Sequence, residues 1–215
     1  MSALPLPASD GGGRFPGMSA TGQVRHWDTT TSAVVMARLG PPGDVRFFTP
    51  AEEATADALF NQLLDQHEEP RVPVVALVDA RLARQDTDGW HYEGMPIDPE
   101  AWRRTLAGLD EDARMRCGCL LAEATWPQQA RLLQSIQNLG PTPWRGMPAT
   151  QVWSLWTRYA CSAFYSHPWA WDEIGFAGPA YPRGYKNMGL NSVEPFEVRD
   201  AHPTDDPTRG KEGHR

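Results

Sequence analysis

Apolar residues recur at spacings of three and four along the middle of the chain. This is the period of α-helices that bury one face. It predicts five helices, within residues 49–66, 72–84, 98–124, 125–138 and 148–167. No segment shows the strict alternation of a half-buried strand. The pattern therefore predicts a mainly α protein.

Two of these helices begin with a recognisable capping signal. Thr49 precedes Pro50, and Glu52 follows at the third helical position, which is the spacing of a capping box. Thr125 and Gln128 repeat that spacing. These starts are therefore predicted from local chemistry as well as from periodicity.

The two ends of the chain lack a helical pattern. Residues 1–46 are rich in Gly, Pro, Ser and Thr, which predicts an extended, partly disordered arm. The last helix should end before Pro168, and an irregular segment should follow it to about residue 200. Residues 201–215 are polar and interrupted by proline, as in a tail. We expect one helical domain over residues 47–200, between this arm and this tail.

The irregular segment is unusually aromatic. It contains "FYSHPWAWDEIGFAGPAYPRGY", and the whole chain has nine Trp. Trp, Tyr and Arg dominate protein–protein hot spots, and a proline-stiffened segment loses little entropy on docking. Because the rings cluster outside any predicted helix, we expect a partner interface there, made by Trp169, Trp171, Phe176, Tyr181, Arg183 and Tyr185.

The same segment offers an alternative, catalytic interpretation. His167 precedes Asp172 and Glu173, a set that suits acid–base catalysis or a metal. No nucleophile motif accompanies it, and the pattern favours a structural role in satisfying loop backbone groups. The ligand-type residues at 65–69 are sequential at a polar helix end, and no dinucleotide or phosphate-loop motif is present. We therefore expect no catalytic, metal or cofactor-binding residue in this chain. A third alternative is a carbohydrate-binding module whose rings stack on sugars.

Charge and hydropathy limit the possible partners. The formal net charge is −7, which argues against nucleic acid and anionic membranes as partners. No window approaches the roughly 20 apolar residues of a membrane span. No Sec or twin-arginine signal is recognisable, so we expect a cytoplasmic protein.

Three segments together resemble a known family. "FFTPAEEATADAL", "WRRTLAGLD" and "FYSHPWAWDEIGFAGPAYPRGY" are similar, in this order, to the gluconate 2-dehydrogenase subunit 3 family. These proteins are the small subunits of FAD-dependent dehydrogenases whose large subunit is a glucose–methanol–choline oxidoreductase. The resemblance runs from about Phe47 to Val198 and is most specific in the last segment.

The resemblance implies a non-catalytic subunit. In the family, FAD and the catalytic residues belong to the large subunit, and the substrates are sugars, sugar acids, polyols or glycosides. The small subunit supports folding, stability or maturation of the large one, and some complexes add a cytochrome c as electron acceptor. A further hypothesis is that His167, Tyr181 and Arg183 reach the rim of the partner's active site and shape substrate access.

Two features depart from the family's usual pattern. Many members have a longer segment with a Gly-Gly-Asn motif after the last helix, whereas here His167-Pro168 leads directly to "WAWDEIGF", which resembles a compact subgroup. Many members also carry a twin-arginine signal. Without one, we expect a cytosolic complex, and a periplasmic one only if the chain is exported with its partner.

Overall fold

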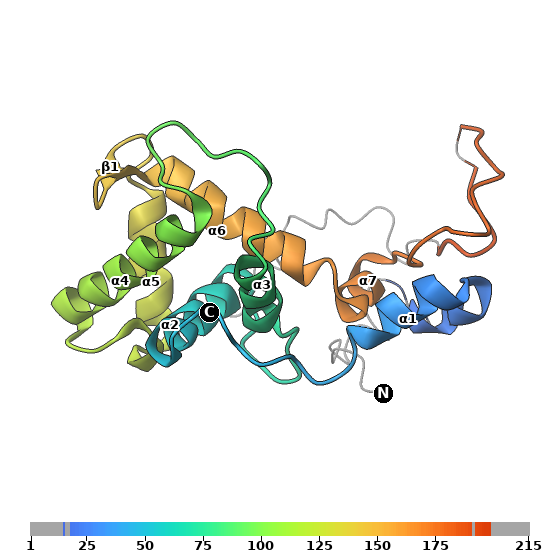
Figure 1. Ribbon diagram of the computed structural model, residues 1–215, viewed down its shortest axis with the longest axis horizontal. Coiled ribbons are helices and arrows are strands. Elements are labelled where there is room, and N and C mark those ends of the chain that lie inside the picture. Colours follow the sequence, from blue (N-terminus) through green and yellow to red (C-terminus); the bar gives the residue numbers. More distant parts are fainter. Residues whose placement is uncertain (1–14, 16–17, 191, 199–215) are drawn as a thin grey trace, which may run out of the picture. The chain divides into compact units, whose positions relative to one another are not determined.

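The computed structural model describes residue 15, residues 18–190 and residues 192–198 (Figure 1). In this part of the chain the fold is mainly α, as the pattern predicts. The α-helices are α1 (Thr29–Ala37), α2 (Pro50–Leu63), α3 (Val74–Ala83), α4 (Asp98–Cys117), α5 (Trp126–Gln137), α6 (Ala149–Phe164) and α7 (Pro168–Ile174). Two 3-10 helices, η2 (Thr21–His26) and η3 (Leu121–Glu123), and two short strands, β1 (Pro143–Trp144) and β2 (Met147–Pro148), complete it.

The described residues form two compact units. The helical unit is the continuous stretch 41–166, which contains α2 to α6. The terminal unit combines the described residues before position 41 with those after position 166. Each unit has its own buried side chains.

The helical unit confirms the five predicted helices. Helix α2 packs against α3, α4, α5 and α6, so it lies at the centre of the unit. Trp102 is fully buried, with its ring 5.4 Å from that of Phe60 and 5.5 Å from that of Tyr159. Several of the tryptophans thus serve as core residues of a small helical unit.

Both predicted capping boxes are present. The Thr49 hydroxyl accepts a hydrogen bond from the Glu52 amide, and the Glu52 carboxylate accepts one from the Thr49 amide. Thr125 and Gln128 make the equivalent box at α5. Local sequence therefore determines where these two helices begin.

Two details of the helical unit differ from the prediction. The helix expected over 98–124 ends at Cys117, because Gly118 adopts a left-handed conformation with φ of 74°. Strands β1 and β2 form an antiparallel hairpin that the pattern does not predict. The hairpin is two residues long on each side, too short for an alternating pattern, and the Trp144 indole N–H anchors it by donating to Asp112 at 2.8 Å.

The expectation of an extended arm over residues 1–46 is wrong for the described part of that segment. It contains η2 and α1, and Asp28 caps α1 by accepting from the Thr31 amide at 2.7 Å. Of the residues in α1, Val35 is buried. A helix with so narrow an apolar face leaves little periodic signal. Residues 1–14 and 16–17 of the predicted arm and residues 201–215 of the predicted tail lie outside the described residues.

The segment after α6 is not wholly irregular, which corrects a second expectation. Helix α7 begins immediately after His167 and ends before Gly175, which has φ of 69°. Pro168 ends the preceding helix as predicted, but it also occupies the first turn of α7, where proline is well tolerated. From Gly175 to Val198 the described chain has no helix or strand.

Candidate functional site

The terminal unit joins two segments that are far apart in the sequence. Trp171 of α7 is buried with Ala20, Trp27 and Val35, and Figure 1 shows α1 beside α7. The Ala20 amide donates to the Asp172 carboxylate at 2.6 Å. This small core positions the C-terminal segment on a helical base.

A close approach of backbone to ring fixes the chain after α7. Gly178 has φ of +75°, and a Cβ atom there would lie 2.4 Å from Cζ2 of Trp27. Both the conformation and the space exclude larger residues at this position. The chain thereby lies close against the Trp27 ring before it continues to Tyr181.

The structure divides the predicted interface residues into two groups. Trp169 and Trp171 lie in α7, which corrects the expectation that all six cluster outside helices. Trp171 is 5% exposed and belongs to the core of the terminal unit, while the half-buried Trp169 ring lies 4.9 Å from the His167 ring. The Trp171 ring also lies 5.4 Å from the ring of Phe176.

The other group is accessible. Phe176 is 40% exposed, Tyr181 65% and Tyr185 51%, and Arg183 is half-buried. Further exposed apolar side chains follow them in the sequence, namely Met188, Leu190 and Val193. We call the six exposed side chains the C-terminal apolar surface; they are Phe176, Tyr181, Tyr185, Met188, Leu190 and Val193. Large apolar side chains gathered in one exposed segment are typical of a binding surface.

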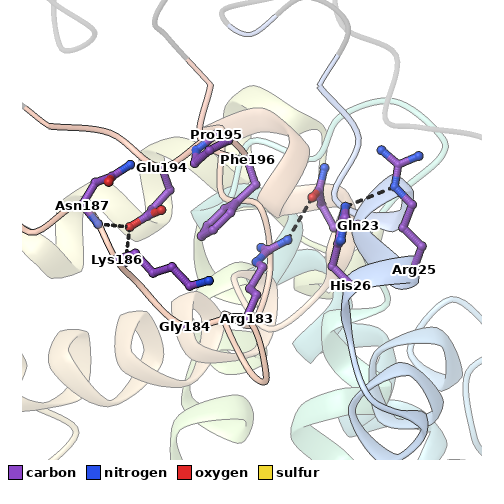
Figure 2. A pocket seen from close by; sticks show the side chains of 10 residues that line it. All are labelled: Gln23, Arg25, His26, Arg183, Gly184, Lys186, Asn187, Glu194, Pro195 and Phe196. Atoms are coloured by element: carbon purple, nitrogen blue, oxygen red, sulfur yellow. Dashed lines mark hydrogen bonds between the residues drawn. The ribbon is translucent and has the colours of Figure 1, made fainter.

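A pocket of about 460 Å³ lies in the terminal unit (Figure 2). Its lining comes from η2 and from the segment after Tyr181, and consists of Gln23, Arg25, His26, Arg183, Gly184, Lys186, Asn187, Glu194, Pro195 and Phe196. The volume is that of a small-molecule site. Part of the lining of this concave site therefore follows directly after the exposed Tyr181 in the sequence.

Arg183 is the best-held side chain in this pocket. Its two terminal nitrogens donate to Gln23 Oε1 at 2.9 Å and to the Ala177 carbonyl at 3.1 Å. Its guanidinium carbon lies 3.6 Å from the centre of the Phe196 ring. Figure 2 shows the two side chains next to each other. The sequence interpretation included Arg183 but missed Phe196, whose only signal is an aromatic residue among polar neighbours.

The candidate acid–base residues have structural contacts instead. His167 is 2% exposed, and its Nδ1 accepts the Trp169 amide at 3.3 Å as the cap of α7. Burial lowers the His167 pKa, the principal effect, although a hydrogen bond with the Arg38 backbone opposes this shift. Burial also raises the pKa values of Asp172 and Glu173, and the Ala20 amide partly offsets the rise at Asp172. No hydrogen bond or ion pair joins these three described side chains to one another, so the geometry favours the structural interpretation.

The described residues hold neither a cluster of metal ligands nor a membrane-spanning helix. No group of three or more His, Cys, Asp or Glu side chains in them is arranged to hold a metal ion. Nor is any described helix both long enough and apolar enough to cross a membrane.

A family model described as gluconate 2-dehydrogenase subunit 3 matches residues 50–178, more than half of the chain. The chain belongs to the gluconate 2-dehydrogenase subunit 3 family. Membership implies a complex with a catalytic dehydrogenase subunit. Searches among curated proteins and among solved structures gave no match.

The extent of the family match separates two parts of the site. The matched range contains α2 to α7 and ends at Gly178, so it includes Trp169, Trp171 and Phe176. Tyr181, Tyr185 and every residue that lines the pocket lie outside it. Family membership therefore supports a role in partner binding for Trp169, Trp171 and Phe176. It gives no support for Tyr181, Tyr185 or the pocket.

Proposed function

We propose that this chain is a non-catalytic small subunit that binds and stabilises the FAD-dependent catalytic subunit of a dehydrogenase. The observation that carries the proposal is the exposed C-terminal apolar surface on a chain of the subunit 3 family. Such a family member needs a binding face for its large subunit, and this surface is the strongest candidate among the described residues.

The construction of the surface supports this role. Its rings project from a segment that packs on the buried cluster of Trp27, Val35 and Trp171. A surface held in place by its own core loses less conformational entropy when a partner covers it. Burying apolar area contributes roughly 25 cal/mol per Å². Several large side chains together therefore favour association, against the cost of immobilising the two partners.

The chemistry of the complex belongs to the large subunit in this proposal. FAD would bind there, in a glucose–methanol–choline type oxidoreductase, and a hydroxyl group of a sugar, glycoside or polyol would be oxidised. The chain described here would contribute no catalytic residue. We place the complex in the cytoplasm, with a cytochrome c as one candidate electron acceptor.

The substrate-access hypothesis becomes narrower. Of the three residues in this hypothesis, His167 is only 2% exposed. A partner can therefore reach only Tyr181 and Arg183. If these two line the entrance to the partner's active site, substitutions there raise KM while the complex stays intact.

Co-expression tests the proposal directly. The flavoprotein encoded by the neighbouring gene is produced with and without this chain, and its soluble yield, FAD content and activity are compared. We expect the two chains to co-purify and the flavoprotein to lose soluble yield, bound FAD or both when produced alone. A flavoprotein that is soluble, FAD-loaded and active alone, and that does not retain this chain, contradicts the proposal.

A further inference from the structure

The pocket in the terminal unit has an unbalanced charge. Arg25, Arg183 and Lys186 line it together with His26, whereas Glu194 is the only carboxylate among its lining residues. The whole chain has a formal net charge of −7. The pocket is therefore positively charged although the chain as a whole is acidic.

Glu194 offsets only one of these positive charges, and its hydrogen bonds are to backbone amides rather than to the cations. Its side chain accepts hydrogen bonds from the backbone amides of Lys186 and Asn187, as Figure 2 shows. The residue is 5% exposed. Its carboxylate thus holds the backbone of the loop that carries Lys186.

Arg183 also lacks a counter-ion among the described residues. The groups that contact its guanidinium are a glutamine oxygen, a carbonyl and an aromatic ring, all of them uncharged. Burial lowers its pKa, as expected for a cation withdrawn from water without a carboxylate partner. No ion pair in the described part of the chain joins Arg25, Arg183 or Lys186 to an acid.

The size and the lining of the pocket indicate a ligand larger than a bare inorganic anion. The pocket of about 460 Å³ is within the range of small-molecule sites. The Phe196 ring and the amides of Gln23 and Asn187 line it beside the cations. An apolar face with a few convergent polar groups suits an organic molecule that carries one anionic group.

We propose that this pocket binds a small organic anion that carries a carboxylate or a phosphate group, with Arg183 and Lys186 compensating its charge. Each terminal nitrogen of Arg183 makes one hydrogen bond within the chain and carries a second N–H, and guanidinium N–H groups pair well with carboxylate and phosphate oxygens. The pocket lies entirely outside residues 50–178, so this proposal does not rest on the family match.

Calorimetric titration of the full-length chain at low ionic strength tests this. The probes are gluconate, glucose 6-phosphate, neutral glucose and inorganic phosphate. We expect at least one sugar anion to bind, glucose not to bind, and inorganic phosphate to bind more weakly than the sugar anion. Whichever of gluconate and glucose 6-phosphate binds identifies the anionic group. Equal binding of glucose, or no binding of either sugar anion, overturns the proposal, and phosphate binding as tightly as the sugar anions overturns its organic part.

Variants locate the binding. Arg183→Gln should weaken the sugar anion about tenfold or more, as expected for a lost charge-assisted pair. Arg104→Gln is the matched control, because Arg104 lies in α4 of the helical unit and its guanidinium pairs with Glu100. An unchanged affinity in Arg183→Gln, or an equal loss in the control, overturns the proposal.

A second variant distinguishes loss of binding from loss of folding. Arg183→Gln also removes the contact with Phe196. The Lys186 side chain, by contrast, makes no hydrogen bond or ion pair with the described residues, and only its backbone amide is hydrogen-bonded. Lys186→Gln should therefore keep the fold and still weaken the sugar anion several-fold. Unchanged affinity in a folded Lys186→Gln protein contradicts the assigned role of Lys186.

Discussion

Single residues determine whether the terminal unit holds together, and two of them allow sharp tests. Gly178 lets the backbone pass against the Trp27 ring, and His167 caps α7 from a buried position. The sequence singles out His167 for possible chemistry rather than as a helix cap, and it gives no sign that Gly178 lies against a ring. Their importance comes from what the other half of the terminal unit places beside them.

Replacing Gly178 with alanine should loosen the terminal unit. A Cβ atom at 2.4 Å from Trp27 forces the ring or the backbone to move, in addition to the cost of roughly 1–2 kcal/mol for an L-residue at this φ. Hydrogen exchange followed by mass spectrometry should show faster exchange in α1 and α7.

Gly184→Ala is the matched control for this prediction. Gly184 has φ of +68°, but a Cβ atom there meets nothing within 4 Å. It should show only the conformational cost. Equal effects of the two substitutions would mean that the contact with Trp27 contributes nothing.

The His167 cap should make the terminal unit sensitive to acid. Its pKa in the folded protein lies below the ordinary value of 6.5, so the unfolded chain binds a proton that the folded chain excludes. The stability that neutral His167 contributes is therefore complete above about pH 6.5 and is lost as pH falls through the lowered pKa.

We test this with His167→Asn, which keeps a side-chain acceptor at the cap but does not titrate. Between pH 7.5 and pH 5.5, the free energy of unfolding should fall less in this variant than in the wild type. Asp172 and Glu173 have raised pKa values and the opposite slope at lower pH, so only the difference between the two proteins is informative. The exposed His91 provides the control substitution, and an unchanged slope in His167→Asn would refute the prediction.

At the scale of elements, local chemistry determines where two of the helices begin. It does not determine how the helices and the segments between them pack together. The boxes at Thr49 and Thr125 were predictable because a capping box is made by residues three positions apart. The approach to α2, by contrast, is held by Asp79 of α3, which is 31–33 residues away in the sequence. Its carboxylate accepts the amides of Arg46, Phe47 and Phe48 at 2.7, 2.7 and 2.8 Å.

Asp79→Asn should therefore destabilise the helical unit. The amide group of Asn turns one acceptor oxygen into a donor that faces a backbone N–H, and Asp79 is fully buried. A loss of about 2–3 kcal/mol in the free energy of unfolding is expected for a buried charged acceptor. Chemical denaturation measures it, and Asp86→Asn serves as the exposed control. A change within about 0.5 kcal/mol of that control would contradict the role assigned to Asp79.

At the scale of the whole molecule, the described chain has two units with different tasks. The helical unit buries Trp102, Trp156 and Tyr159 and has the features of a stable core. The terminal unit carries the C-terminal apolar surface and the cationic pocket. The proposed partner contact therefore belongs to the terminal unit.

Two methionines provide a matched test of that assignment. Met188 of the C-terminal apolar surface is 88% exposed, and Met115 of α4 is 72% exposed. Met188→Ser should weaken binding of the catalytic subunit by about tenfold, because burial of one large apolar side chain contributes roughly 1.5–3 kcal/mol. Met115→Ser should leave binding unchanged. The two dissociation constants are compared by surface plasmon resonance, and a larger effect at Met115 would move the interface to the helical unit.

The sequence by itself determined the features that depend on neighbouring residues. The five helices of the helical unit, both capping boxes and the end of α6 before Pro168 follow from short-range periodicity and backbone restriction. The family followed from three segments of the chain, the last and most specific of which carries the aromatic cluster.

Only the tertiary structure decided which of those aromatic residues are buried and which are exposed. Trp171 is covered because α1, more than 130 residues earlier in the chain, packs on α7, while Tyr181 remains exposed. The pocket likewise needs η2 beside the segment from Arg183 to Phe196. Local pattern carries no information about such pairings, because the free energy that makes them comes from contacts between residues far apart in the chain.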